Sequence, residues 1–146
     1  PARIVTRAQF VKMLVLAFGL DDSDAVTEFA DVNNNDWFYP YVAAADQFGL
    51  TKGDGTNFYP NRTLTREEMA VLAYRALEIS GIEIPEVNEE TEFADAETIS
   101  EYATEGITAM QKAGIINGMG DNIFAPKTMC NRAMAAKVIS SLLRLE

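Results

Sequence analysis

Three stretches of this 146-residue chain repeat one another, and this repetition limits the possible folds more than any single motif does. The stretches are PARIVTRAQF from Pro1, PNRTLTREEM from Pro60 and PKTMCNRAMA from Pro126. In each stretch an arginine follows six residues after the proline, which gives Arg7, Arg66 and Arg132. A chain of this length can bury one sizeable core, or several small cores packed together.

A second pattern occurs twice, starting at Phe29 and at Phe93. Both copies open with Phe-Ala-Asp, run through a helical stretch and reach a Gly-x-Gly turn that is followed by an asparagine. These turn residues are Gly53, Gly55 and Asn57 in the first copy, and Gly118, Gly120 and Asn122 in the second. We interpret 1–20 as the second half of a truncated repeat, 29–80 and 93–146 as repeats, and 21–28 and 81–92 as connections.

Helix signals coincide in five places. Two capping boxes, in which a hydroxyl and the third residue's side chain satisfy backbone donors, are Thr6 with Gln9 and Thr65 with Glu68; Asn131 can cap alone. Apolar residues then recur at helical spacing, and the first-half helices stop at Gly49 and Gly114. We predict an all-α fold of tandem helix-loop-helix repeats, with helices near 6–19, 38–48, 65–80, 98–113 and 131–145. The three second-half helices should pack against one another.

Charge and composition exclude several function classes. Twelve basic against 22 acidic residues give a net charge of -10, which would repel nucleic acid and anionic membrane surfaces. Histidine is absent and Cys130 is the single cysteine, so neither a His-based triad nor a cysteine-rich metal site can form within the chain. We expect no enzymatic activity, cofactor, nucleic-acid partner or membrane insertion, and we interpret Cys130 as a core residue.

A calcium loop that starts at Asp31 is disfavoured. Its sixth position is Asp36 rather than glycine, and its twelfth is Val42 rather than glutamate. We expect Asp31 and its counterpart Asp95 to accept hydrogen bonds within loops.

In this order, Phe-x-Asp-Val, Trp37, Gly-x-Gly, Phe-x-Pro and Thr-Arg-(Ala/Glu)-(Gln/Glu) resemble the S-layer homology family over essentially the whole chain. The resemblance implies a pseudo-threefold bundle with grooves between neighbouring repeats, where family members bind secondary cell-wall polysaccharide, often pyruvylated glycan. The family's ligand-binding arginine matches Arg7, Arg66 and Arg132. The resemblance also implies a secreted protein in the cell wall or S-layer, non-covalently anchored, with a covalently linked cargo domain outside this chain.

The residue chemistry agrees with an anionic ligand. A guanidinium can bond a carboxylate with two parallel donors, and a helix N-terminus beside it favours anions. The groove candidates beside the three arginines are Trp37, Lys52, Gly53, Asp54, Gly55, Asn57, Gly118, Gly120 and Asn122.

The three arginines are not expected to be equivalent. Arg66 belongs to the best-preserved repeat, so its loss should weaken binding more than loss of Arg132, with little change in thermal stability. Arg7 should lack a complete groove. The first helix should expose an apolar surface around Phe10, Val11 and Phe18, covered by an upstream segment or by a neighbouring molecule.

One alternative stays open at this point. The repeats could form a protein-interaction or self-assembly scaffold of the cell surface in which the sugar sites have degenerated, with self-association in place of glycan binding.

Overall fold

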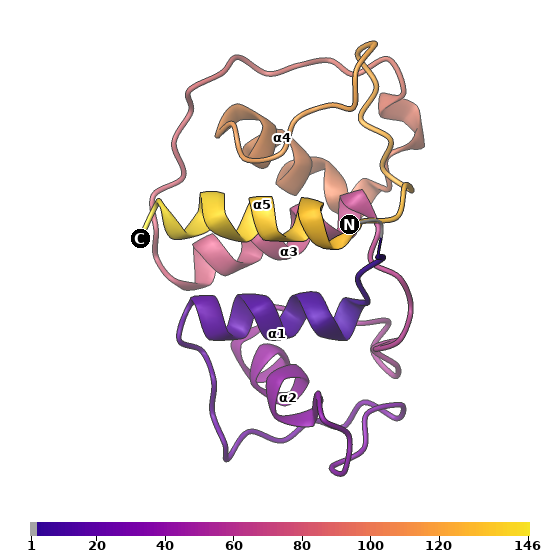
Figure 1. Ribbon diagram of the computed structural model, residues 1–146, viewed down its shortest axis with the longest axis vertical. Coiled ribbons are helices and arrows are strands. Elements are labelled where there is room, and N and C mark those ends of the chain that lie inside the picture. The colour runs from indigo at the N-terminus through magenta and orange to yellow at the C-terminus, as the bar shows by residue number, and fades with distance from the viewer. Residues whose placement is uncertain (1–2) are drawn as a thin grey trace.

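A computed structural model describes residues 3–146 of the chain; Pro1, where the first repeated stretch begins, and Ala2 lie outside the described residues. Its helices are α1 (Arg7–Ala17), α2 (Tyr39–Phe48), α3 (Arg66–Ile79), α4 (Thr104–Lys112) and α5 (Arg132–Leu143), with two 3₁₀ helices, η1 (Ala96–Thr98) and η2 (Glu101–Ala103), before α4 (Figure 1). Among residues 3–146 the only β pairing consists of isolated bridges. The all-α prediction is confirmed.

The long helices begin where the sequence predicts. Thr6 and Thr65 form complete capping boxes with Gln9 and Glu68, and each hydroxyl accepts from the backbone N–H three residues on. Asn131 caps α5 alone, by accepting from the backbone N–H of Met134 at 2.8 Å. These caps satisfy donors that would otherwise be unpaired at the three helix starts.

The predicted helix over 98–113 is wrong in its first third. Ile99 and Ser100 are extended, which separates η1 from η2 and delays α4 until Thr104. The cause is a long-range contact. The buried carboxylate of Glu67 accepts from the Ser100 backbone N–H at 3.0 Å and from its hydroxyl at 2.7 Å. A donor held by another helix cannot take part in a local helical turn.

A closed ring of three backbone hydrogen bonds joins the starts of α1, α3 and α5. Val5 N–H donates to Cys130 at 3.0 Å, Cys130 N–H donates to Leu64 at 2.8 Å, and Leu64 N–H donates to Val5 at 2.8 Å. All three side chains are buried, which confirms Cys130 as a core residue. Each ring residue lies just before the N-cap of its helix, so the three helices converge there and each packs against the other two.

The short helices pack against the long helix that precedes them in the chain. α2 packs on α1, and α4 packs on α3 (Figure 1). The second contact is close at Gly106 of α4, where an added Cβ would lie 3.2 Å from the Cα of Val71. Gly106 thus lets the backbones of α3 and α4 approach each other.

This pairing overturns the prediction of an exposed apolar surface on the first helix. Phe10 and Val11 are 0% exposed, and Phe18 is partly buried against the core. The prediction assigned a partner helix only to the second-half helices that follow a first half in the chain. The structure shows that α1 receives its cover from α2, which comes after it.

The burial of the ring residues leads to a prediction about stability. Leu64→Ala should lower the free energy of unfolding by about 2 to 5 kcal/mol, because Leu64 is fully buried and truncation leaves a cavity. Met129→Ala, one residue from Cys130 but 60% exposed, is the control and should change it by less than about 0.5 kcal/mol. Urea unfolding followed by circular dichroism measures both. Equal effects would show that the ring region is not a packed core.

Candidate functional site

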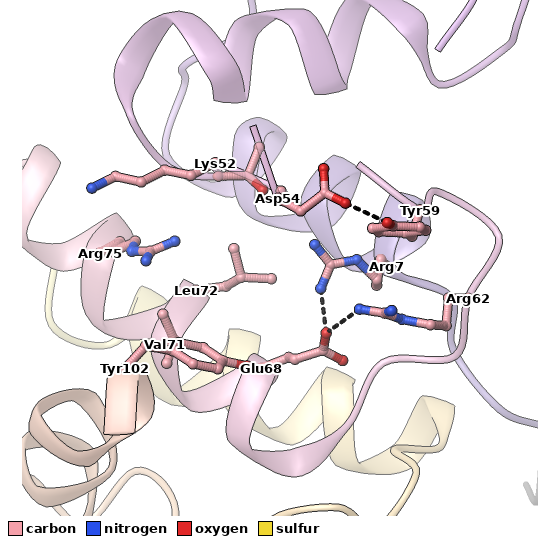
Figure 2. Close-up of a pocket in the computed structure, with 12 residues that line it drawn as sticks. Arg7, Lys52, Asp54, Tyr59, Arg62, Glu68, Val71, Leu72, Arg75 and Tyr102 are labelled. Carbon is pink, nitrogen blue, oxygen red and sulfur yellow. Dashed lines mark hydrogen bonds and ion pairs between the residues drawn. The ribbon is translucent and has the colours of Figure 1, made fainter. Parts of the chain in front are cut away.

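A groove of about 490 Å³ lies where α1, α3 and the loop after α2 meet (Figure 2). Its volume is in the range of small-ligand sites in proteins. Arg7 from α1 lines it, together with Lys52, Gly53, Asp54 and Tyr59 from the loop. Residues of α3 and its preceding segment complete the lining: Arg62, Glu68, Val71, Leu72 and Arg75, with Tyr102 from η2.

Arg7 is anchored at the edge of this groove. Its side chain is nearly buried, its Nε–H donates to the Phe58 carbonyl at 3.0 Å, and its guanidinium lies 4.9 Å from the Phe58 ring centroid. Its Nη1 forms an ion pair with Glu68, whose carboxylate also accepts from Arg62 at 3.2 Å. Glu68 therefore both caps α3 and orients two arginines.

The turn around Asp54 shapes the groove wall. Asp54 Oδ1 accepts from the backbone N–H groups of Asn57 at 2.7 Å and Thr56 at 2.9 Å, and Tyr59 donates its hydroxyl to Oδ2. The backbone bond from Asn57 and the Tyr59 hydroxyl are the main causes that lower the pKa of Asp54 to about 2. The carboxylate is thus held ionised by the turn it closes.

The Gly-x-Gly pattern here is a conformational requirement. Gly53 has φ of 54°, and an added Cβ would lie 2.2 Å from the Asn57 carbonyl oxygen. Gly55 and Asn57 are not among the lining residues of the groove and act through the turn. Asp31 supports the same loop by accepting from the backbone N–H groups of Phe58 and Tyr59. Asp95 supports the second Gly-x-Gly loop by accepting from those of Phe124 and Ala125, so both are confirmed as loop acceptors.

Arg66 occupies the corresponding place beside the second Gly-x-Gly loop. Its Nε–H donates to the Phe124 carbonyl at 2.9 Å, its Nη2 donates to the Asn117 carbonyl, and its guanidinium lies 4.7 Å from the Phe124 ring centroid. Arg66 is 5% exposed, and this burial lowers its pKa. The Asn117 carbonyl takes the place that the Glu68 carboxylate has beside Arg7.

The second loop is built like the first. An added Cβ on Gly118 would lie 2.9 Å from the Ile123 carbonyl oxygen, and Gly120 has φ of 98°. Asn122 donates its side-chain amide to the Glu92 carbonyl at 2.9 Å. Each Gly-x-Gly loop therefore lies beside the arginine of the preceding long helix.

This placement corrects two expectations. Lys52, Gly53 and Asp54 line the groove of Arg7 rather than that of Arg66, so Arg7 does have a groove. The sequence order suggested otherwise because the loop is followed directly by α3. The physical reason is that Arg7 bonds to the carbonyl of Phe58, which lies 51 residues later.

A second groove of about 490 Å³ contains Arg132 and Trp37. Trp37 is 53% exposed, and Lys12 Nζ lies 5.6 Å from its ring centroid. Gln9 and Met13 of α1 complete this wall. Trp37 thus shares a groove with Arg132 and not with Arg66.

Sequence reasoning missed Arg62, Arg75 and Tyr102. Arg75 could have been found from helical spacing, since it lies seven residues after Glu68 and three after Leu72, which puts all three on one face of α3. Arg62 and Tyr102 have no local signal, because long-range packing brings them to the groove. Within residues 3–146, no cluster of three or more metal-ligating side chains occurs.

Comparison with known proteins agrees with this architecture. Residues 28–70 and 92–136 match the S-layer homology domain. The chain belongs to the S-layer homology family. Both matched segments contain a short helix, its Gly-x-Gly loop and the start of a long helix.

Similar proteins include enzymes and surface-layer proteins. The chain is 40% identical to the exoglucanase XynX of Acetivibrio thermocellus, with 98% of the chain and 13% of that protein covered. It is 39% identical to an amylopullulanase of Thermoanaerobacterium thermosulfurigenes (98% and 8% covered) and 33% identical to the S-layer protein sap of Bacillus anthracis (96% and 17% covered). The chain thus spans between 8% and 17% of the length of these relatives.

The burial of Arg66 replaces the expectation that its loss leaves stability unchanged. Arg66→Ala should lower the free energy of unfolding by about 1 to 3 kcal/mol, because it removes the donor for two loop carbonyls. Arg132→Ala should change it by less than about 0.5 kcal/mol, since Arg132 is exposed. Urea unfolding measures both variants. An unchanged free energy of unfolding for Arg66→Ala would mean that water hydrogen-bonds to the loop carbonyls in place of the guanidinium.

The Asp54 turn can be tested by pH. Because the folded pKa of about 2 lies below the ordinary 3.8, the carboxylate stabilises the turn above pH 3.8, and this contribution is lost as the pH falls through 2. Tyr59→Phe removes one donor to the carboxylate and should raise the pKa of Asp54. Carbon NMR of the Asp54 carboxyl during an acid titration measures this. An unchanged pKa of Asp54 in Tyr59→Phe would show that the Tyr59 hydroxyl does not stabilise the carboxylate.

Proposed function

We propose that this chain anchors a larger protein non-covalently to the bacterial cell wall by binding secondary cell-wall polysaccharide in its inter-repeat grooves. The observation that carries the proposal is the charge of the Arg7 groove. Four cationic side chains and two carboxylates line it, in a chain whose net charge is -10. Such a local surplus of positive charge suits an acidic saccharide, and a pyruvylated glycan offers the carboxylate that arginine recognises.

The arrangement of the repeats supports this proposal. We infer an approximate threefold bundle in which 29–80 and 93–146 are repeats, 1–20 is the second half of a truncated repeat, and 21–28 and 81–92 are connections. Its basis is the ring of Val5, Leu64 and Cys130, which relates three helix starts by equivalent hydrogen bonds. Grooves then lie between neighbouring long helices.

The grooves differ in what they offer a ligand. Arg7 presents its groove with an oriented ion pair, and Arg132 presents an exposed guanidinium beside an exposed indole. The Nε and Nη2 donors of Arg66 bond to backbone carbonyls. We therefore propose the Arg7 and Arg132 grooves as the principal glycan sites.

Relatives set the context of the function. Relatives of the chain include surface-layer proteins, which supports a location at the cell surface, in the cell wall or S-layer. Other relatives are named as polysaccharide-degrading enzymes, so a covalently linked cargo domain is proposed here too. None of the helices described over residues 3–146 has the length and apolar character to cross a membrane.

Binding to purified sacculi tests the anchor function. The chain should sediment with sacculi, and acid extraction of the wall polymer should abolish this. Arg7→Lys keeps the charge but loses the planar fork, so binding should weaken by about tenfold or more if one charge-assisted hydrogen bond of about 1.5 to 3 kcal/mol is lost.

The matched control is Lys137→Gln, which removes one exposed charge on α5 outside the grooves and should bind like wild type. Melting curves separate a binding defect of Arg7→Lys from loss of fold. If sedimentation survives acid extraction, or if the chain only self-associates, a protein-interaction or self-assembly scaffold replaces the anchor.

A further inference from the structure

The Arg7 groove has two cationic ends of different character. In Figure 2, Arg7 and Arg62 lie toward one end with Glu68, whereas Lys52 and Arg75 lie toward the other. At the first end both arginines are paired with the Glu68 carboxylate. At the second end, no carboxylate of residues 3–146 lies within ion-pair distance of Lys52 or Arg75.

Arg75 is held in place by a hydrogen bond to the backbone rather than by an ion pair. Its Nη1 donates to the Leu50 carbonyl at 3.3 Å, which is a neutral acceptor. Burial lowers the pKa of Arg75, and the positive charge of Arg7 acts in the same direction, whereas Tyr102 and the Glu78 carboxylate act in the opposite direction. Partial burial is therefore the main cause that disfavours the charged guanidinium of Arg75 in the free protein, and an anionic ligand bound beside it would stabilise that charge.

The surface between the two ends suits a sugar ring. Val71 and Leu72 are nearly buried and supply apolar contacts, and Leu72 lies between the two ends in Figure 2. Tyr102 lines the groove and is 57% exposed as a residue, while its hydroxyl donates to Glu67 at 3.4 Å. An aromatic face next to aliphatic side chains can pack against the C–H groups of a saccharide, and neither contact supplies charge.

We propose that Lys52 and Arg75 form a second anion subsite in this groove, so that its preferred ligand is a saccharide segment with two anionic groups, one at each end. This proposal rests on the proposed function and refines its ligand class. The first group binds at Arg7 and Arg62, and the second, a carboxylate or a phosphate, binds at Lys52 and Arg75. Arg75 orients the second group through its fork, and the flexible Lys52 adds charge.

Isothermal titration with charge-sorted wall polymer tests this subsite. Fragments released from sacculi are separated by anion exchange into fractions with one and with two anionic groups. Wild type should bind the dianionic fraction about tenfold or more tightly than the monoanionic one, the gain from one further charge-assisted contact. Lys52→Gln/Arg75→Gln should bind both fractions with the monoanionic affinity of wild type.

The single variant Lys52→Gln distinguishes loss of the subsite from misfolding. Because Lys52 is exposed, its loss should remove part of the preference for the dianionic fraction without shifting the melting temperature. Lys137→Gln is the matched charge control and should keep the full preference. Phosphomonoesterase treatment and, separately, cleavage of phosphodiesters with hydrofluoric acid distinguish the two sources of the second group: a preference lost after either treatment identifies phosphate, and one retained after both identifies carboxylate.

Three results would overturn the subsite, and they differ from one another. Equal binding of both fractions by wild type shows that the groove reads a single anion. A preference that survives in the double variant shows that other residues read the second anion. Failure of wild type to bind either fraction or intact sacculi removes the proposed anchor function itself.

Discussion

The backbone hydrogen bonds that join Val5, Leu64 and Cys130 hold together the starts of the three long helices, which carry Arg7, Arg66 and Arg132. Each of these residues uses both its N–H and its carbonyl within the ring. All three are buried, so a lost hydrogen bond would leave a backbone group unpaired away from water, which costs free energy of folding. The ring brings three helix starts to one place. Because an arginine is the first residue of each of these helices, the ring also brings three guanidinium groups to the same end of the molecule.

The sequence predicts the local structure well and the assembly only in part. Caps and helical periodicity predict α1, α3 and α5 to within a few residues, because those signals lie within each segment. The extended Ser100 was missed since Glu67, which holds it, lies 33 residues away. The groove of Arg7 was missed for the same reason. A repeat seen in the sequence runs from a short helix to the long helix after it, whereas each groove combines a loop with the long helix before it.

The three arginines share a position in the repeat but differ in their partners. The difference depends on the third residue of another long helix. Beside Arg7 this residue is Glu68 of α3, which supplies a carboxylate. The equivalent residue of α5 is Met134, which offers no carboxylate, and Arg66 bonds to the Asn117 carbonyl instead. The equivalent residue of α1 is Gln9, which lines the groove of the exposed Arg132. One motif that repeats within the chain therefore produces an ion-paired, a buried and an exposed guanidinium.

The overall acidity of the chain and its cationic grooves act at different distances. At physiological salt, charges more than about 8 Å apart are largely screened, so a ligand near the surface experiences mainly the side chains it touches. The net charge of -10 then disfavours loose adsorption of the chain along an anionic wall polymer. Inside the Arg7 groove, the proposed ligand would meet Arg62, Arg75 and Lys52 at contact distance, where partial burial reduces screening. An acidic protein can thus bind an acidic polymer at a few defined places, and on the proposed function the number and position of the polymer's anionic groups would decide which segments are bound.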